Sequence, residues 1–444
     1  MLRMSTDFGM REQSVDAGKN SFLAFYPKGL WVYTLGEIIK SIKYKGYNIT
    51  DVIITENSAI YSGKNELPIM VGILKNMYPL KYFITKEELT KYTENFPEYG
   101  LPNNERLSVT KEDLIDLVQK FIPEKEFEGN LSHSFSFSIY GIGTFRCTFS
   151  TARNKYILKI RILNFIPPAL LDIKDVSKSD IINDSLQVIV PAKYMTFLNT
   201  LIVSKTLQVK NLELQMSHIP SGGLIIHAGA TGTGKTTFLA GEIKYLSEIT
   251  NGLTVTYEAP IEYIYITSNR ILQYELGRDI RREEIFNHFL RSTPTVGFFH
   301  ECKNKEDFEL VIDLATRGHL VLTTLHASNV LEVFNLFGTL SDEFKRSFAS
   351  ILKAIVVHRL TLDIDGRIVP YYEIFYNNIK ESRAVMSNFT LSDSPYTIRN
   401  QLYEPGEKPY IMTFEKCLQE WVKHKVLSEE VARNEKLVLE LQRD

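Results

Sequence analysis

The run Gly229-Ala-Thr-Gly-Thr-Gly-Lys-Thr236 limits what this chain can fold into more than any other stretch of its sequence. An apolar segment, residues 224–228, precedes the run, and a helix-compatible segment, residues 237–246, follows it. Glycines at these spacings let backbone N–H groups turn inward around an anion, and the start of a helix adds the positive end of its dipole. A strand, a glycine-rich turn and a helix in this order predict a phosphate-binding loop rather than an ordinary turn.

The side chains of this loop have separate expected roles. Lys235 is placed to reach the β- and γ-phosphates of a nucleotide, and the Thr236 hydroxyl to take a position on Mg²⁺. ATP and Mg²⁺ are therefore the expected cofactors. The nucleotide-binding residues that we expect from the loop and the first helical turn are Gly229, Thr231, Gly232, Thr233, Gly234, Lys235, Thr236 and Thr237.

Three glutamates follow apolar strands farther along the chain. Glu258 and Glu262 come at the end of the strand expected after the loop helix, and Glu301 ends another apolar run. The carboxyl ends of parallel strands meet at one sheet edge, so these side chains should face the phosphates. A carboxylate there can hold the water shell of Mg²⁺ or orient an attacking water, although each glutamate alone also fits a solvated strand end.

Two histidines bracket a further apolar strand, residues 320–325. His319 precedes this strand and His326 follows it, within Thr316-Arg-Gly-His-Leu-Val-Leu-Thr-Thr-Leu-His-Ala327. A histidine beside a buried strand is also compatible with a core or rim residue. The order and spacing of the glutamate and histidine segments after the phosphate loop favour a functional role for these residues.

Length and pattern predict two domains. A chain of 444 residues exceeds the usual size of a single hydrophobic core. From residue 30 to about 165 the pattern mixes helical and alternating segments, which is typical of an α+β domain. Ile166-Pro-Pro168 and a polar segment after it mark a linker. Beyond the linker, short apolar strands alternate with helices, which predicts an α/β domain with a parallel sheet.

Composition argues against several other classes. Lys and Arg (51) nearly balance Asp and Glu (53), so no overall basic field favours direct binding of nucleic acid, although helicases and packaging motors also use such loops. The three cysteines are far apart, which fits neither a disulfide framework nor a structural zinc site. No apolar run approaches the length of a membrane span. We expect a cytoplasmic protein.

Together these stretches resemble the ATPases of type II secretion, type IV pili and type IV secretion. That family follows its phosphate loop with TIEDPIE, a strand ending in GE, and TGHLVLxTLH, and the last of these is nearly intact here. Residues 354–360 resemble the family's AVISQRL, and residues 143–161 resemble GxxRFRVNxFxQR…FR. The resemblance favours the branch of the pilus retraction ATPase and the Dot/Icm and conjugation ATPases, the PilT and DotB group.

The resemblance implies a RecA-like P-loop NTPase domain preceded by a smaller α+β, PAS-like domain. The boundaries that it suggests are a flexible tail at 1–20, the PAS-like domain at 21–170, a linker at 171–190, the RecA-like ATPase domain at 191–385 and a C-terminal helical segment at 386–444. It further implies a homo-hexamer that meets inner-membrane platform or secretion-complex proteins. The ring would lie on the cytoplasmic side of a bacterial inner membrane through these partners, with ATP between the two domains of each chain.

The resemblance also carries residue roles. Glu258 and Glu301 are the candidates to position water and to hold Mg²⁺ through its water shell, and we favour Glu258 for the water. His326, with His319 as a second candidate, would sense the γ-phosphate, and Glu262 belongs to the same acidic set. Three arginines of the first domain are candidates to neutralise phosphate charge or, alternatively, lie on the polar face of a strand: Arg146, Arg153 and Arg161.

The sequence departs from the family pattern at the acidic motifs. Ala259 stands for the Asp of TIEDPIE, His300 for the Gly of GE, and Lys303-Asn304 for the usual Arg-Asp. Glu258, Glu262 and Glu301 are kept. We expect an ATP hydrolase that powers a type IV secretion, conjugation or pilus system by nucleotide-driven domain rotation, and the alternative is a catalytically silent nucleotide-binding subunit of such a ring. No motif identifies the cargo.

Overall fold

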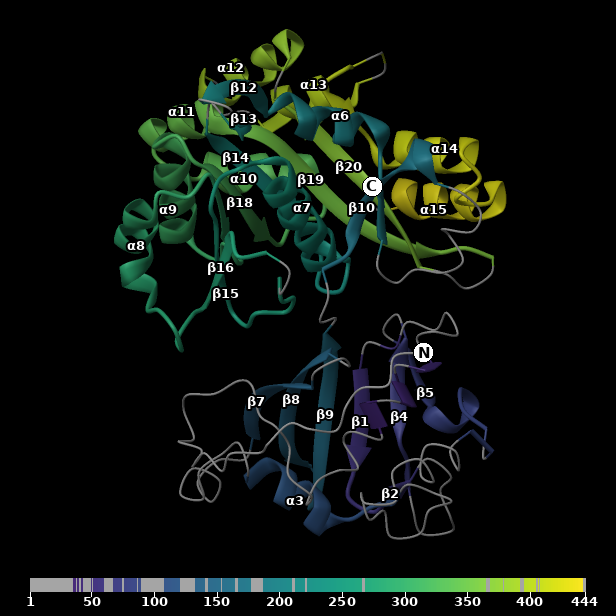
Figure 1. Cartoon of the computed structure of the whole chain (residues 1–444). Helices are drawn as coiled ribbons and strands as arrows, with labels where there is room; N and C mark the ends of the chain where they lie inside the picture. Colours follow the sequence, from purple (N-terminus) through teal and green to yellow (C-terminus); the bar gives the residue numbers. More distant parts are fainter. Residues whose placement is uncertain are drawn as a thin grey trace. The chain divides into compact units, whose positions relative to one another are not determined.

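The structure is a computed structural model of the chain (Figure 1). It describes residues 35–36, 38–39, 41–42, 49, 51–59, 67–73, 76–85, 87–88, 108–119, 132–139, 143–152, 154–163, 167–176, 187–209, 212–219, 222–265, 268–364, 368–377, 379–391, 395–404, 406 and 408–441. The chain divides into two compact units, Met1–Ser41 with Ile49–Leu163, and Ile42–Asn48 with Asn164–Asp444. The tail expected at 1–20 lies outside the described residues.

The first unit is built on an antiparallel sheet of six strands in the order β5-β4-β1-β9-β8-β7. These strands are β1 Asp51–Thr55, β4 Met70–Ile73, β5 Asn76–Pro79, β7 Ser132–Ile139, β8 Gly143–Ala152 and β9 Lys155–Leu163. Side chains alternate between buried and part-exposed along β1, because successive residues of a strand face opposite sides of the sheet. The helix α3 (Lys111–Gln119) packs against β9 and buries Leu114, Leu117 and Val118. Its PAS-like character stays a prediction.

The second unit is built on an eight-stranded sheet in the order β16-β15-β17-β18-β14-β19-β20-β21. The strands are β14 Gly223–Ala228, β15 Thr254–Glu258, β16 Ile271–Glu275, β17 Val296–Phe299, β18 Leu320–Leu325, β19 Leu352–Leu362, β20 Ile368–Tyr376 and β21 Ile411–Met412. The first six strands of this order run parallel, and β20 and β21 pair antiparallel. Every residue of β14, β15, β17 and β18 is buried, as expected of parallel strands covered on both faces.

Helices cover this sheet (Figure 1). They are α6 Ala192–Thr200, α7 Lys235–Ile249, α8 Ile285–Ser292, α9 Lys305–Thr316, α10 Val330–Gly338, α11 Asp342–Ile351, α12 Arg383–Leu391, α13 Pro395–Tyr403, α14 Phe414–Lys423 and α15 Glu429–Leu441. The helix α7 contacts β14 and β17, and α9 contacts β14 and β18. The predicted α/β fold with a parallel sheet is therefore confirmed, and its four expected strands are β14, β15, β17 and β18.

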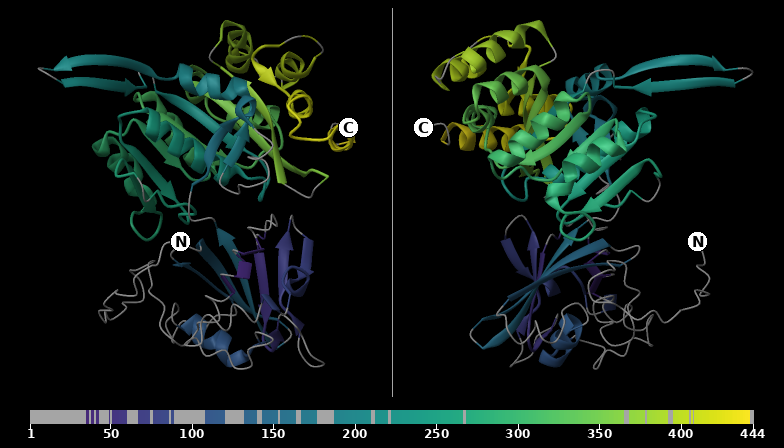
Figure 2. Two further views of the ribbon diagram at one scale, coloured as in Figure 1. Left: turned by 45° about the vertical axis from the view of Figure 1, so that its right-hand side comes forward. Right: turned by 90° about the vertical axis from the view of Figure 1, so that its left-hand side faces the viewer.

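Two segments before β14 extend the second unit. Strand β10 (Ala169–Asp172) pairs in parallel with β11 (Gln187–Val190), and both contact α7, so part of the stretch that we expect to be a linker forms strands here. Strands β12 (Val203–Val209) and β13 (Leu212–His218) form an antiparallel hairpin. Figure 2 shows this hairpin projecting from its unit in both views.

The chain after β20 also differs from a simple helical segment. Strand β21 joins the main sheet beside β20. A turn at Lys425, where φ is 60°, separates α14 from α15 within the C-terminal segment that we expect to be helical. None of the helices in the described part of the chain combines the length and apolarity that crossing a bilayer requires.

Candidate functional site

The turn between β14 and α7 has the backbone that a phosphate cradle needs. Gly229, Gly232 and Gly234 adopt φ values of +148°, +81° and +84°, a region that residues with a Cβ disfavour. A Cβ on Gly229 would also lie 2.6 Å from Thr233 Oγ1 and 2.9 Å from the His358 carbonyl oxygen. The helix α7 starts directly after Gly234, so its N-terminal N–H groups face the turn.

Lys235 is the first residue of α7 and points back over the loop. Its ammonium donates hydrogen bonds to the carbonyl oxygens of Gly229 (2.6 Å) and Ala230 (2.9 Å). Burial lowers the pKa of Lys235 to about 8, although the carboxylates of Glu301 and Glu262 act in the opposite direction. A triphosphate in the loop would compete with the two carbonyls for this ammonium.

The threonines of the loop differ in their partners. The Thr233 hydroxyl donates to a carbonyl oxygen of the loop at 2.8 Å, and Thr237 Oγ1 accepts from the Tyr263 hydroxyl at 2.8 Å. Thr231 is exposed, and Thr236 is half-buried in the first turn of α7. Thr236 is therefore the threonine whose position suits a hydroxyl ligand of a nucleotide-bound cation.

The register of the sheet brings the candidate acids to the edge where the loop begins. Ala228, at the end of β14, pairs with Leu325, at the end of β18, so His326 follows beside Gly229. Tyr257 on β15 pairs with Phe299 on β17. The residues that come next along each strand are Glu258, His300 and Glu301, and they share this edge of the sheet with the phosphate loop.

Glu258 is the last residue of β15 and is 4% exposed. Its Oε1 accepts hydrogen bonds from the Thr256 hydroxyl (2.6 Å) and from Gln273 Nε2 (3.0 Å). Burial raises the pKa of Glu258 to about 7, and these two hydrogen bonds offset the burial only in part. A carboxylate with a pKa near 7 is suited to accept a proton from water at neutral pH.

Glu301 is joined to the phosphate loop through His326. Its Oε1 lies 2.9 Å from His326 Nε2, and His326 Nδ1 lies 3.1 Å from the Gly229 carbonyl oxygen. Both neighbours are acceptors, so the imidazole serves both only when it carries two N–H groups. Glu301 itself adopts φ +52°, and its backbone N–H donates to Thr324 Oγ1 at 3.0 Å.

The charge of Glu301 is also compensated by a lysine. Lys303 Nζ lies 3.1 Å from Glu301 Oε2. Burial raises the pKa of Glu301, but Lys303, His300 and His326 outweigh it, and the net pKa is lowered. Glu301 is therefore ionised at neutral pH, whereas Glu258, with a pKa of about 7, is only partly ionised there. Lys303 and His300 are two of the positions at which this sequence departs from the family pattern.

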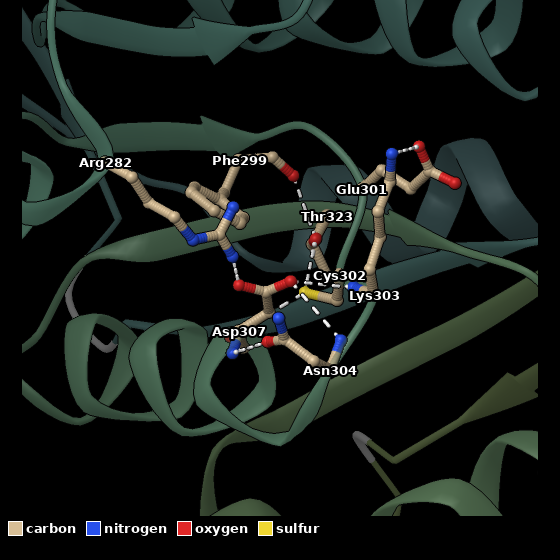
Figure 3. Close-up of polar contacts among 8 residues, drawn as sticks. All are labelled: Arg282, Phe299, Glu301, Cys302, Lys303, Asn304, Asp307 and Thr323. Atoms are coloured by element: carbon tan, nitrogen blue, oxygen red, sulfur yellow. Dashed lines mark hydrogen bonds and ion pairs between the residues drawn. The ribbon is translucent and has the colours of Figure 1, made fainter. Parts of the chain in front are cut away.

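Figure 3 shows how the segment after Glu301 is held. Asp307, 1% exposed, pairs with Arg282, and its Oδ2 accepts the backbone N–H of Lys303 at 2.8 Å. The Asn304 side chain caps α9 by accepting the Asp307 N–H at 3.0 Å. Arg282 is exposed at the start of a short helix, and its guanidinium neutralises the buried Asp307 carboxylate.

Arg282→Ala is expected to lower the free energy of unfolding by about 2 kcal/mol, because Asp307 Oδ1 has no hydrogen-bond partner among the described residues and loses its counter-charge. Thermal unfolding followed by circular dichroism measures the change. Arg281→Ala is the matched control, since Arg281 pairs with Glu284 on the surface, and it should leave the melting temperature almost unchanged. Equal melting temperatures for the two variants would contradict this assignment.

Other candidates lie away from this edge. His319 precedes β18, and its carbonyl oxygen accepts the Gly223 N–H at 2.9 Å, at the start of β14. The strand separates His319 from the phosphate loop by about 20 Å, and its Nδ1 lies 2.5 Å from the Pro294 carbonyl oxygen. A γ-phosphate-sensing role for His319 is therefore wrong, because the two histidines lie at opposite edges of the sheet.

The candidate arginines belong to the first unit. Arg146 on β8 is exposed and pairs in register with Arg161 on β9. Arg161 Nε lies 3.2 Å from Asp51 Oδ1. Arg153 lies outside the described residues. A role for the three arginines at the phosphates stays a prediction.

The roles of several residues at this edge are not indicated by the motifs alone. Thr256 and Gln273 hold Glu258, and Tyr263 holds Thr237, yet the motif containing Thr256 gives this residue no role, and Gln273 and Tyr263 lie outside that motif. Glu262 lies in the loop after β15, near enough to raise the pKa of Lys235. These features together define a P-loop nucleotide-binding domain with an α/β fold.

Comparisons with known proteins agree with this class. Residues 195–390 match the family described as "Type II/IV secretion system protein". Type IV pilus ATPase PilU of Pseudomonas aeruginosa is 35% identical over 154 residues, which cover 33% of this chain and 40% of PilU. The chain thus spans less than half the length of this curated relative.

Two solved structures share the fold. The pilus retraction motor PilT with bound ADP has a TM-score of 0.59 at 22% identity, and it covers 90% of this chain and 95% of its own. The ATPase DotB of Legionella pneumophila has a TM-score of 0.62 at 17% identity, and the match covers 95% of this chain and 99% of the DotB chain. The predicted resemblance to the type II and type IV secretion and pilus ATPases is therefore confirmed over residues 195–390, and the two structures confirm the predicted RecA-like α/β fold.

Proposed function

We propose that this chain hydrolyses ATP and drives a type IV secretion, conjugation or pilus system. The observation that carries the proposal is the connection from the phosphate loop through His326 to Glu301, with Glu258 buried at the same edge of the sheet. A loop that binds nucleotide for structural reasons alone needs no buried acid with a pKa near 7 beside it.

The residues of the edge divide the chemistry between them. Lys235 and the N–H groups at the start of α7 hold the phosphates, and Glu258 accepts a proton from the attacking water. The Thr236 hydroxyl and, through water, the Glu301 carboxylate suit Mg²⁺, which takes oxygen ligands. Mg²⁺ would neutralise phosphate charge. Glu262 supports the charged form of Lys235.

The donor set fits a cation shared with nucleotide rather than a protein-only metal site. In the described part of the chain, no group of three His, Cys, Asp or Glu side chains is arranged to hold a metal ion. Mg²⁺ in nucleotide sites usually has one or two protein ligands beside phosphates and waters. Thr236 and Glu301 would supply that number.

The proposal also includes a mechanical step, in which a ring of six copies converts hydrolysis into movement. Six copies assemble, and loss of the γ-phosphate rotates one domain against the other, which is the work stroke. Arg146, Arg153 and Arg161 neutralise phosphate charge in this scheme. The partners are platform or secretion-complex proteins at the cytoplasmic side of a bacterial inner membrane, and direct nucleic-acid contact is not part of the proposal.

A catalytically silent nucleotide-binding subunit is the second candidate. Ala259 removes one acid of the family pattern, and Lys303 compensates the charge of Glu301. Phosphate release by the purified protein separates the two candidates. An active enzyme releases phosphate well above the level of a Lys235→Ala control, whereas a silent subunit releases no more than that control.

The rate of hydrolysis is expected to rise about tenfold per pH unit below pH 7 and to level off above it, because only ionised Glu258 accepts the proton and its pKa is about 7. Steady-state phosphate release between pH 5.5 and 8.5 at saturating ATP measures this profile. Binding of a fluorescent ADP analogue over the same range is the control. A flat rate profile with unchanged binding would exclude Glu258 as the base.

His326→Ala is expected to reduce turnover about tenfold and to leave ADP affinity within about threefold, because it removes the link between Glu301 and Gly229 but no phosphate-binding group. The measurements are phosphate release and fluorescent-ADP titration. The matched control is His319→Ala at the opposite edge of the sheet, for which wild-type turnover is expected. Equal turnover of the His326→Ala variant and the wild-type protein would contradict the proposed link.

A further inference from the structure

Four buried polar side chains from four elements form a chain beneath the phosphate loop. His227 on β14 lies with Nδ1 2.9 Å from Nε2 of His358 on β19. His227 Nε2 lies 2.9 Å from Oε2 of Glu242 on α7, and the Tyr194 hydroxyl on α6 donates to Glu242 Oε1 at 2.9 Å. None of the four side chains is more than 2% exposed.

Each contact of this hydrogen-bond network can hold one hydrogen between its two atoms. Burial lowers the pKa of His358 well below its ordinary value, and His227 and Lys235 lower it further, so His358 is neutral, and one hydrogen lies between its Nε2 and His227 Nδ1. Burial, with Glu242 beside it, raises the pKa of Tyr194 far above its ordinary value, so its hydroxyl stays a donor.

The contact between His227 and Glu242 closes the network. A buried carboxylate is costly unless it is hydrogen-bonded, and His227 is the group that lies against Glu242 Oε2. Neither His227 Nε2 nor Glu242 Oε2 has another hydrogen-bond partner among the described residues. His227 therefore donates from Nε2 to Glu242, and its Nδ1 shares one hydrogen with His358 Nε2.

The four hydrogen-bonded side chains join both ends of the phosphate loop to the strand β19 beside it. His227 lies two residues before Gly229, where the loop begins, and Glu242 lies two turns after Lys235 on the helix that ends it. The His358 carbonyl oxygen limits Gly229 to a residue without Cβ.

The Phe238 ring fills the space between these groups. This side chain of α7 lies 5.3 Å from His227, 4.9 Å from His358 and 5.5 Å from Tyr194, measured between ring centroids. Phe238 is 1% exposed, so the four hydrogen-bonded side chains and the first two turns of α7 pack together in the core.

An apolar core would pack α7 against β14 equally well, but it would not fix their orientation. Hydrogen bonds between buried groups are directional, and a satisfied network permits a single relative placement of the elements that it joins. A shift of α7 along β14 would leave His227 Nε2 and Glu242 Oε2 without their hydrogen bond, which is costly in a buried setting.

We propose that His227, His358, Glu242 and Tyr194 are positioning residues that set the phosphate loop in the geometry required for turnover. The inference rests on the proposed hydrolysis of ATP. It assigns these residues no contact with nucleotide, so their loss should reduce kcat while nucleotide affinity changes little.

The main test is the double variant His227→Leu with Glu242→Met, in the full-length protein. The double variant replaces both members of a buried polar pair with apolar side chains, which is often close to neutral for stability, whereas Glu242→Met alone leaves His227 without its partner. We expect a melting temperature near that of the wild-type protein, ADP affinity within about threefold and a kcat lower by about tenfold. A double variant with wild-type kcat would overturn the inference.

Tyr194→Phe is a milder test that should fold in any case, because it removes one hydroxyl. We expect kcat to fall about threefold, because one hydrogen bond to the Glu242 carboxyl group is lost. Tyr371→Phe is its matched control, since the Tyr371 hydroxyl donates to Glu435 at 2.8 Å at the far helix α15 and should leave kcat unchanged. Equal kcat values for the two variants would overturn the inference.

Two different results distinguish failure of the proposed ATP hydrolysis from failure of the positioning role. Wild-type protein that releases no more phosphate than Lys235→Ala would exclude hydrolysis itself. Wild-type protein that hydrolyses ATP, with a double variant of equal kcat, would exclude the positioning role alone.

Discussion

Lys235→Ala is expected to reduce ATP turnover at least a hundredfold, to the level of a no-enzyme control. The Lys235 ammonium lies at the N-terminus of α7 within 3 Å of two loop carbonyl oxygens, so it is the cation nearest to phosphates held in the loop. Removing one preorganised donor that faces the developing charge typically lowers the reaction rate by roughly two to three orders of magnitude. Phosphate release at saturating ATP measures the effect.

The Lys235→Ala variant should fold normally, which makes its loss of turnover interpretable. Burial lowers the pKa of Lys235 to about 8, so charging this residue at neutral pH does not stabilise the folded protein. The sign follows from linkage: a lysine with a lowered pKa binds its proton less tightly in the folded state than in the unfolded state. Lys436→Ala, on the exposed face of α15, is the matched control and should keep wild-type turnover. Turnover of Lys235→Ala within a few-fold of that control would refute ATP hydrolysis at this loop.

Glu258→Gln is expected to reduce turnover by about two to four orders of magnitude and to raise the melting temperature at pH 8. The loss of turnover follows from removing the proton acceptor. The gain in stability follows from the buried carboxylate: its pKa of about 7 exceeds the unfolded value, so ionising it disfavours the fold. The stabilisation should be much smaller near pH 5, because folded Glu258 is protonated there and its unfolded pKa is about 4.5. Phosphate release and thermal melts at both pH values test this prediction.

Glu301→Gln gives a useful contrast to Glu258→Gln. The net pKa of Glu301 is lowered, because Lys303, His300 and His326 outweigh burial, so its ionised form favours the fold. Neutralising this residue should therefore not raise the melting temperature at pH 8. A stabilising effect of both substitutions, or of neither, would contradict the different environments of the two acids.

The structure explains the departures from the family pattern at two positions, residues 303 and 304. Lys303 pairs with Glu301, and Asn304 caps α9 through its side chain, so both serve the segment after β17. Asp307 receives the backbone N–H of Lys303 and pairs with Arg282, as seen in Figure 3. The structure gives no reason for Ala259 in place of Asp.

Much of the site could be predicted from local sequence. Glycine spacing, Lys235 and Thr236 determine the phosphate loop, because the left-handed backbone at Gly232 and Gly234 is a property of those residues and their neighbours. The apolar runs determine β14, β15, β17 and β18, since completely buried strands need a continuous apolar sequence. The parallel order of these strands then implies that their carboxyl ends meet.

Only the tertiary structure decides which side chains meet across elements. The pairing of Arg282 with Asp307 and the chain from Tyr194 to His358 join residues far apart in sequence, and no local pattern encodes such contacts. The two histidines around β18 look equivalent in the sequence, yet strand direction puts His326 at the phosphate loop and His319 at the opposite edge. Local conformation depends on neighbouring residues, whereas burial, charge pairing and pKa depend on what the fold brings together.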